Sequence, residues 1–498
     1  MAGIGFELKK LFRRKGLLAG TRAYGYASVV CAGPMLLGVL LLLGVMTLCD
    51  MMGVDRQNRE LLVCMITYTL LASLLVTSVL SLIVTRFIAD MLFEEREGEV
   101  LPSFWGSNTL MLAAGCPLYG VFLYFSGATV LQGALCLWLF AELIVTWNGM
   151  SYLTAIKDYR NLLLAFVAGI GVALAASWLM LYLETPPVEG VLCGVSLGYG
   201  VMLLWDVRLL QRYFPTGEGS PWRFLSWAKR EWRLMGVGLF TNIGLFSHLV
   251  IIWAGPIGVQ VKGLFYGAPY HDVPALLAFL VSLVTTVNFV VSVEVNFYPT
   301  YRTYYGLFND GGVVGDILVA GEKMLAVLSR ELRYTAMKQL FVSICVIALE
   351  TSLLDLLPLG FNNLMHGYFR TLCVGYSVYA VGNAVMLILL YFTDYWGAFV
   401  STLAFAMVST GLTVVSLGFD VNFYGFGFLA GAVVFQLLAV CRLNVFTRNL
   451  PYRILGQQPF LDDDDREKPT GLALALDRID RLLFAAIRHK DGEESHGA

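Results

Sequence analysis

Long blocks of apolar residues, separated by short polar segments, follow one another along most of the chain. Each block is long enough to cross the hydrocarbon core of a bilayer as a helix, which takes about 20 apolar residues. Two blocks nearly touch at Ser126 and Gly127, so eleven or thirteen spans are the alternatives to twelve. The pattern predicts an all-α polytopic membrane protein with about twelve transmembrane helices, at residues 23–48, 61–84, 107–126, 128–148, 161–183, 189–207, 234–255, 273–297, 336–357, 369–392, 396–417 and 422–441.

The distribution of Lys and Arg between the polar segments orients these helices. Of the 34 Lys and Arg, all but four lie in or beside segments on the same side of the membrane as the N-terminus. Basic residues accumulate on the cytoplasmic side of membrane proteins. Missing a single span would invert every later segment and destroy this asymmetry, so an even number of spans is favoured. We therefore expect both termini in the cytoplasm.

Two long polar segments divide the chain. The loop 208–233 carries six basic residues and separates six spans in residues 23–207 from six in residues 234–441. A second cytoplasmic loop is expected at 298–335, where Gly311 and Gly312 precede an amphipathic run. Equal halves that both start on the cytoplasmic side are compatible with a parallel structural repeat.

Both ends of the chain contain amphipathic segments. Residues 1–22 place apolar and basic side chains on different faces of a helix, which predicts a basic interfacial helix on the inner leaflet. A disordered basic tail is the alternative. The apolar run that follows is too long for a signal peptide, and no small-residue cleavage site comes after it. The cytoplasmic tail 442–498 holds an acidic run and a predicted surface helix, whose apolar stripe is Leu472, Leu476, Ile479 and Leu483.

Composition excludes several classes of function. Hydrophobic residues make up 58% of the chain and charged residues 14%, against about 25% charged in soluble domains. A net charge of -2 gives no basic field for a nucleic-acid partner. The nine cysteines are isolated, the five histidines are scattered, and no P-loop is present. The acidic run Asp462–Asp465 matches the DxD pattern of sugar transferases but lies in a charged tail. We expect no enzyme activity, metal or cofactor.

A polar stripe in the eighth span is the first candidate for a substrate pathway. Its members fall within about a third of the helix circumference at about 100° per residue. Such a stripe lines a wet cavity or bonds to another helix, and both interpretations stay open. The stripe consists of Ser282, Thr285, Asn288, Ser292 and Asn296.

Aromatic and amide side chains in two other spans extend this candidate pathway. Tyr376, Tyr379 and Asn383 share one side of the tenth span, and Asn242 and His248 lie in the seventh. Aromatic faces and amides suit neutral sugars, which present both C–H faces and hydroxyls. The alternatives are an ordinary packed helix and a structural histidine.

Acidic residues inside spans are candidates for ion coupling, because a charge at mid-bilayer costs at least about 2.5–3.5 kcal/mol. Glu142 and Glu350 are expected well inside the fourth and ninth spans. Asp206 and Glu294 lie nearer cytoplasmic ends, where side chains can reach water. Small residues at every fourth position instead predict close helix packing. These glycines are Gly190, Gly194 and Gly198 in the sixth span and Gly427 and Gly431 in the twelfth.

Several patches of this sequence resemble one family of transporters. They are the opening Met1–Leu11 (MAGIGFELKKL), Ala23–Ala27, Ala32–Pro34, Thr85–Asp90, Asn296–Tyr305, Leu390–Phe392 and Tyr452–Leu455. They are similar to the inner-membrane transporters of bacterial Pel exopolysaccharide systems. These belong to the polysaccharide branch of the multidrug/oligosaccharidyl-lipid/polysaccharide (MOP) exporters. The resemblance implies two six-helix bundles around a central cavity, a cytosolic glycosyltransferase, membrane scaffold partners that sense cyclic di-GMP, and a polymer rich in N-acetylgalactosamine.

The leading hypothesis is therefore export of this polymer across the bacterial inner membrane, pushed by synthesis at a docked transferase. The basic loops would dock the partners, through Arg223, Arg230 and Arg302, with Arg22 at the cytoplasmic mouth of the first span. One alternative is an ion-coupled flippase of lipid-linked oligosaccharides, or a drug exporter, of the same fold. Another is a membrane scaffold of a polysaccharide synthase that transports nothing.

Overall fold

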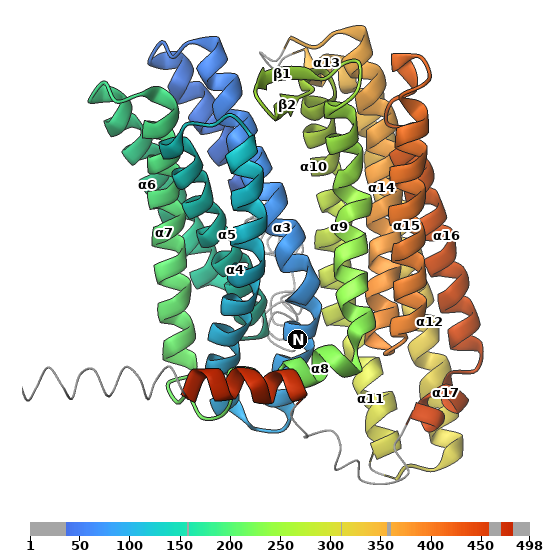
Figure 1. Ribbon diagram of the computed structural model, residues 1–498. Coiled ribbons are helices and arrows are strands. Elements are labelled where there is room, and N and C mark those ends of the chain that lie inside the picture. Colours follow the sequence, from blue (N-terminus) through green and yellow to red (C-terminus); the bar gives the residue numbers. More distant parts are fainter. Residues whose placement is uncertain (1–35, 157–158, 310, 356–359, 458–469, 482–498) are drawn as a thin grey trace, which may run out of the picture.

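The computed structural model describes residues 36–156, 159–309, 311–355, 360–457 and 470–481 (Figure 1). The predicted interfacial helix at 1–22, Arg22 and the acidic run Asp462–Asp465 lie outside these residues. Within the described chain, ten helices are long and apolar enough to cross a membrane. The all-helical membrane architecture is confirmed, whereas the number of twelve spans stays a prediction.

The first half of the chain forms a group of upright helices on the left of Figure 1. Their cores share buried aromatic side chains such as Phe87, Phe104 and Phe140. The short 3-10 helix η1 (Glu97–Glu99) joins the helix that ends at Phe93 to the helix that begins at Val100. The helices are Leu36–Met51, α3 (Arg56–Phe93), α4 (Val100–Phe125), α5 (Val130–Ile156), α6 (Tyr159–Tyr182) and α7 (Pro187–Tyr213).

The second half stands beside the first, and α3 and α9 lie next to each other along the boundary (Figure 1). It has its own hydrophobic core, which includes Phe405, Phe428 and Phe435. A two-stranded antiparallel hairpin, β1 (Val259–Lys262) and β2 (Phe265–Gly267), follows α9 at one end of the molecule. The helices are α9 (Trp232–Trp253), α10 (Pro269–Ser292), the π-helix η2 (Val293–Phe297), α11 (Tyr298–Asn309), α12 (Val314–Ala348), α13 (Glu350–Leu354), α14 (Asn363–Tyr391), α15 (Tyr395–Ser416), η3 (Val421–Phe423), α16 (Phe426–Arg448) and α17 (Leu450–Gln457).

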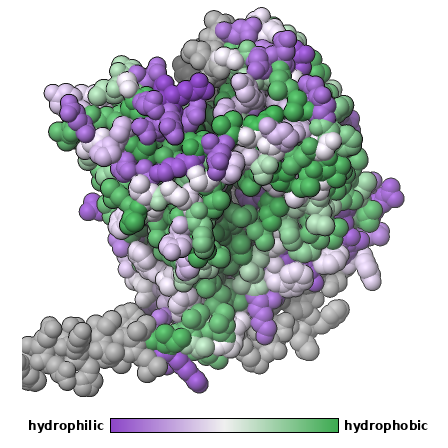
Figure 2. All heavy atoms as spheres, turned by 45° about the horizontal axis from the view of Figure 1, so that its top comes forward, coloured by the Kyte–Doolittle hydropathy of each residue, from purple (hydrophilic) through white to green (hydrophobic). Residues whose placement is uncertain are grey.

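The two ends of the molecule differ, and we name them by their contents. The hairpin end carries β1, β2 and α13, at the top of Figure 1. The linker end carries α8 (Leu225–Arg230), which belongs to the predicted loop 208–233 and leads into α9. Hydrophilic residues gather at the hairpin end in Figure 2, and hydrophobic residues cover much of the side below it.

The segment 298–335, expected as a loop, is mostly helical. Residues from Tyr298 form α11, which continues the eighth span, and α12 begins at Val314 and runs on to Ala348. The amphipathic run and the following apolar block therefore form one continuous helix. Because this helix ends nine residues before the predicted end of the ninth span at residue 357, Glu350 lies beyond it rather than inside.

The final helix, residues 471–481, docks at the linker end. Ser220 Oγ donates to Asp477 at 2.7 Å, and the Trp222 indole N–H donates to Asp480 at 2.7 Å. Of the predicted apolar stripe, Leu476 packs with the buried Ala473 against the core of the first half, whereas Leu472 and Ile479 are 59% and 50% exposed. The docked face therefore combines two hydrogen-bonded carboxylates with part of the predicted stripe, whose last member, Leu483, lies outside the described residues.

Glycines bring neighbouring helices into contact, as the sequence predicted. A Cβ added at Gly194 of α7 would lie 2.4 Å from Ser177 Oγ of α6. One added at Gly431 of α16 would lie 2.7 Å from the Cβ of Ser409 on α15. Without a hydrophobic driving force between helices in lipid, such close van der Waals contact is a main source of association.

The polar stripe of α10 packs against α12. Gln339 Oε1 accepts from the backbone N–H of Thr285 at 3.1 Å and from its hydroxyl at 2.7 Å. Asn288 donates to Thr335 at 2.6 Å and accepts from Lys338 at 2.7 Å. Further bonds join Ser292 to Glu331 and Gln339 to Ser343 and Ser377. The structure thus favours the interhelical interpretation for these residues.

Replacing Gly431 by Ala tests the helix contact. The new methyl group would overlap α15, so we expect the free energy of unfolding to fall by about 1–3 kcal/mol. Gly411→Ala is the matched control on α15, because a Cβ there meets nothing within 4 Å. Thermal unfolding of the purified proteins in detergent measures both, and equal midpoints for the two variants would contradict the packing role.

Replacing Gln339 by Ala tests the α10–α12 network. Thr285, Ser343 and Ser377 would lose buried bonds, which predicts a loss of about 1–3 kcal/mol in unfolding free energy. Asn296→Ala, at the exposed end of the same stripe, should leave the unfolding midpoint unchanged. A Gln339→Ala protein as stable as the wild type would show that these bonds do not hold the helices together.

Candidate functional site

A cavity of about 310 Å³ lies between the two halves. Its walls come from α3, α4 and α5 of the first half and from α9 of the second. Both α3 and α5 run toward the linker end, and the lining residues come from their middle and later parts. The cavity therefore lies at mid-height and in the half nearer the linker end. Its described lining residues are Leu74, Thr77, Ser78, Ser81, Thr85, Met111, Trp147, Asn148, Met150, Ser151, Thr154 and Asn242.

Hydroxyl groups of α3 form one wall. Thr77 donates to the carbonyl of Ser73 at 2.9 Å, Ser78 to Leu75 at 2.7 Å, and Thr85 to Ser81 at 2.8 Å. Each hydroxyl proton is thus used inside the helix, as is common for Ser and Thr in helices. The oxygen lone pairs remain as acceptors along the wall.

The opposite wall, on α5, carries an oriented indole and amide. Trp147 Nε1 donates to Ser73 Oγ at 3.1 Å, which fixes the ring against α3. The Asn148 amide donates to Ser107 at 2.8 Å and to Asn108 at 2.9 Å. These bonds fix the orientation of the amide, whose oxygen is buried and has no partner in the structure.

The cavity presents neutral chemistry. None of the lining residues that the structure describes is charged, and its surface combines an indole, two amides and several hydroxyls. In the described chain no group of His, Cys, Asp or Glu is placed to hold a metal ion. Such a site can bind a neutral polyhydroxylated molecule through acceptor oxygens and aromatic stacking.

Aromatic side chains close the hairpin end above this cavity. Tyr68 of α3 stacks on Trp253 of α9, with ring centroids 4.7 Å apart, and on Phe122 of α4 at 5.6 Å. The Tyr68 hydroxyl donates to the carbonyl of Tyr266 at 3.1 Å and accepts from its N–H at 3.2 Å. We call this group, Tyr68, Phe122, Trp253, Phe265 and Tyr266, the hairpin-end seal.

The hairpin itself reaches across to the first half. The Leu264 N–H donates to the carbonyl of Ser126 at 3.0 Å, and Lys262 donates to Gln132 at 3.3 Å. Gly263 takes a φ of +55°, and a Cβ there would lie 2.0 Å from the Ser126 oxygen. Only glycine permits both this turn and this approach.

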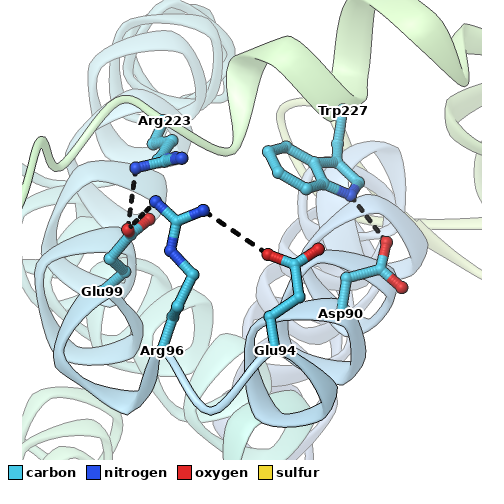
Figure 3. A network of polar contacts seen from close by, with 6 residues as sticks. All are labelled: Asp90, Glu94, Arg96, Glu99, Arg223 and Trp227. Carbon is cyan, nitrogen blue, oxygen red and sulfur yellow. Dashed lines mark hydrogen bonds and ion pairs between the residues drawn. The ribbon is translucent and has the colours of Figure 1, made fainter. Parts of the chain in front are cut away.

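At the linker end, a polar network ties α8 and the preceding linker to the first half (Figure 3). The Trp227 indole donates to Asp90 at 2.8 Å, and Arg223 donates to Glu99 at 2.7 Å. Arg96 bonds the same Glu99 oxygen at 2.7 Å. Glu99 is only 9% exposed, so two guanidinium groups balance a carboxylate that is nearly buried.

The residues predicted for the substrate pathway divide between two places. Asn242 lines the cavity. The polar stripe on α10 lies mostly in the contact with α12, and Asn296 is exposed. His248 and Tyr376 form a buried pair at 3.4 Å, Tyr379 packs against both Phe405 and Phe435, and Asn383 is half-buried on α14.

The acidic candidates need two corrections. Glu350 begins α13 near the hairpin end and pairs with Arg370 and, at 3.6 Å, with His366, so it is not a lone acid inside a span. Asp206 was expected to reach water, yet it is 3% exposed and its oxygens lack hydrogen-bond partners among the described residues. The side chain is therefore enclosed by protein and does not reach water.

Glu142 lies within α5, 9% exposed, and accepts from the Trp138 indole at 2.8 Å. Its second oxygen is buried and has no partner in the structure. Glu142 thus stays a candidate for ion coupling. Of the arginines expected to dock partners, Arg223 belongs to the linker network, whereas Arg230 and Arg302 are exposed.

The cavity wall on α3 has a polar pattern in the sequence, whereas the substrate pathway was predicted from the same kind of pattern on α10. Ser73, Thr77, Ser81 and Thr85 recur every fourth residue in α3, the same pattern that marked the stripe in α10. Periodicity alone shows only that polar groups share a face. Whether that face meets a partner helix or a cavity depends on packing between segments far apart in the sequence.

Comparison with known proteins identifies the architecture. The chain resembles, over 85% of its length and 96% of the other chain, a MOP superfamily transporter from Pyrococcus furiosus, with 13% identity and a TM-score of 0.58. It also resembles an outward-facing MATE family multidrug resistance transporter (14% identity, TM-score 0.59, covering 90% and 99%) and a MATE transporter in a bent conformation (15%, 0.61, 90% and 98%). No curated protein matched the chain. These likenesses show the MOP transporter fold.

A family model that matches almost all of the membrane region identifies the family. The family model described as "PelG: Putative exopolysaccharide Exporter (EPS-E)" matches residues 1–455. This range includes α3, α4, α5 and α9, and with them the whole described lining of the cavity. The chain therefore belongs to the PelG family.

Proposed function

We propose that this protein exports a Pel-type polysaccharide, rich in N-acetylgalactosamine, across the bacterial inner membrane. The observation that carries the proposal is the uncharged cavity between the halves, in a chain of an exopolysaccharide-exporter family with a transporter fold. A nearly neutral polymer needs no acidic pathway. Hydroxyl and amide oxygens accept from sugar hydroxyls, and Trp147 offers a ring for the sugar C–H face.

The cavity size favours one segment of a single polymer strand at a time. Its volume of about 310 Å³ lies at the lower end of small-molecule pockets, which run from about 300 to 1,000 Å³. The polymer would enter at the linker end, which the Lys and Arg distribution assigns to the cytoplasm, and leave past the hairpin-end seal. Addition of sugars by a cytosolic glycosyltransferase would supply the push.

The α11–α12 hairpin offers the transferase a docking surface. It extends beyond the other helices at the linker end (Figure 1), and its tip exposes Val313, Val314 and Val319, which are 71%, 70% and 67% exposed. Apolar side chains in such a position mark interaction sites. Arg302 of α11 is exposed close by in sequence, and the membrane subunits that sense cyclic di-GMP would bind at the same end.

Filling the cavity should stop export. Ser81→Trp places a large ring in a half-buried position of the α3 wall, so we expect secreted polymer to fall by an order of magnitude or more at unchanged protein level. Leu164→Trp, at a 43% exposed position of α6, is the control. Both are measured as polymer in the medium of a producing strain. Normal secretion by Ser81→Trp would favour a scaffold that transports nothing.

Deletion of this protein from a strain that makes Pel tests the polymer's identity. Export of Pel should stop and return when the wild-type protein is supplied. Continued export without the protein would contradict the proposal. Glu142→Gln in the same strain tests the ion-coupled alternative, because loss of export at normal protein level would show that the carboxylate is needed.

A further inference from the structure

Two histidines face each other inside the second half, close to the hairpin end. His248 of α9 and His271 of α10 are both 0% exposed, with ring centroids 5.5 Å apart. Neither His271 nitrogen has a hydrogen-bond partner in the structure, and neither does Nδ1 of His248. Unpartnered buried nitrogens are costly, so their retention here needs an explanation.

A carboxylate lies beside this pair. Asp272 Oδ2 accepts from the Trp253 indole at 2.8 Å and from the Ala268 N–H at 3.0 Å. Its Oδ1 is buried without a partner and lies 3.7 Å from His271 Nδ1. The carboxylate is thus held on one side and open toward the histidine on the other.

The surroundings contribute no cation. The titratable groups that face the cluster come from α3, from α14 and from the segment before α16, and none of these described groups is positively charged at neutral pH. With neutral histidines the Asp272 carboxylate, whose side chain is 31% exposed, therefore has no cation among these groups, and a proton on the adjacent histidine would supply one. The groups are Cys64, Tyr68, Tyr368, Tyr376, Asp420 and Tyr424.

We propose that His248, His271 and Asp272 form a proton-binding site that opens the hairpin-end seal when it is loaded. One proton on the histidine pair makes the cluster neutral overall. A second would place two like charges about 5.5 Å apart in a buried site, which disfavours it. The site therefore takes up a single proton, shared between two rings.

The bond from Trp253 couples this proton to the seal. A hydrogen bond to an ionised acceptor is about twice as strong as one between neutral groups. When His271 is protonated, its charge offsets that of Asp272, and the carboxylate becomes a weaker acceptor for Trp253. The indole that loses this bond is the ring that stacks on Tyr68 of the first half. Loading the site thus weakens the contact that holds the two halves together at this end.

The inference goes beyond polymer export and does not depend on which polymer is carried. If the hairpin end faces outside, as proposed, protons from outside would bind the site and open the hairpin-end seal. Release of the proton to the cytoplasm would favour closure of the seal. The second half would then contain its own coupling site, separate from Glu142 in the first half.

Pulsed EPR on the full-length protein in nanodiscs, without polymer, tests the proposal. Spin labels on noncanonical residues replace Leu131 of α5 in the first half and Val259 of β1 in the second, which are 57% and 48% exposed. As pH falls from about 8 to about 5.5, a longer distance should appear, with the open-to-closed ratio rising by up to about tenfold per pH unit for one proton.

His271→Gln and His248→Gln together should abolish this pH response. His366→Gln is the matched control, since this histidine lies near the same end but pairs with Glu350, and it should keep the response. A response that survives in the double variant, or that His366→Gln removes, would overturn the proposal.

Histidine-labelled wild-type protein, followed by NMR over the same pH range, covers the case in which the double variant does not fold. One protonation shared between His248 and His271 is expected, and two neutral rings throughout would overturn the proposal. Because no polymer is present, these outcomes are separate from failure of the secretion tests.

Discussion

A polar group inside a bilayer-spanning bundle must bond to another protein group or face water, because lipid offers it no partner. This constraint determines the use of each polar stripe in the protein. On α10, Thr285 and Asn288 bond to α12 and hold two helices together. On α3, hydroxyls such as Thr85 bond only to their own backbone and leave their lone pairs to a cavity. The same residue types thus produce packing in one half and a site in the other.

The two halves touch at both ends of the molecule and at mid-height. A Cβ at Gly238 of α9 would lie 2.1 Å from the carbonyl oxygen of Ser78, so the halves meet backbone to backbone at mid-height. Tyr68 and Trp253 close one end by stacking, and Trp227 with Asp90 tethers the other. The contacts at the two ends are the ones that alternating access would break and form.

Sequence was sufficient for the architecture but not for the site. The ten candidate spans of the described chain each fall on a predicted apolar block, because the length and hydropathy of a span are local properties. The predicted packing of Gly194 and Gly431 was right for the same reason. The predicted block 336–357 instead divides between the end of α12 and α13. The positions of Glu350 and Asp206 were wrong, because the end of α12 at Ala348 and the burial of Asp206 on α7 depend on neighbouring helices. The cavity wall at Thr77–Thr85 was not predicted, because polar residues that face a partner helix and polar residues that face a cavity recur with the same period.

The central claim is that polymer passes the α3 wall rather than the α10 stripe. Photocrosslinking in a polymer-producing strain tests it most directly, with a photoreactive residue placed at Thr85 in one strain and at Asn288 in another. Our account predicts that the protein labelled at Thr85 becomes covalently attached to polysaccharide and that the protein labelled at Asn288 does not. Attachment at Asn288 without attachment at Thr85 would contradict it.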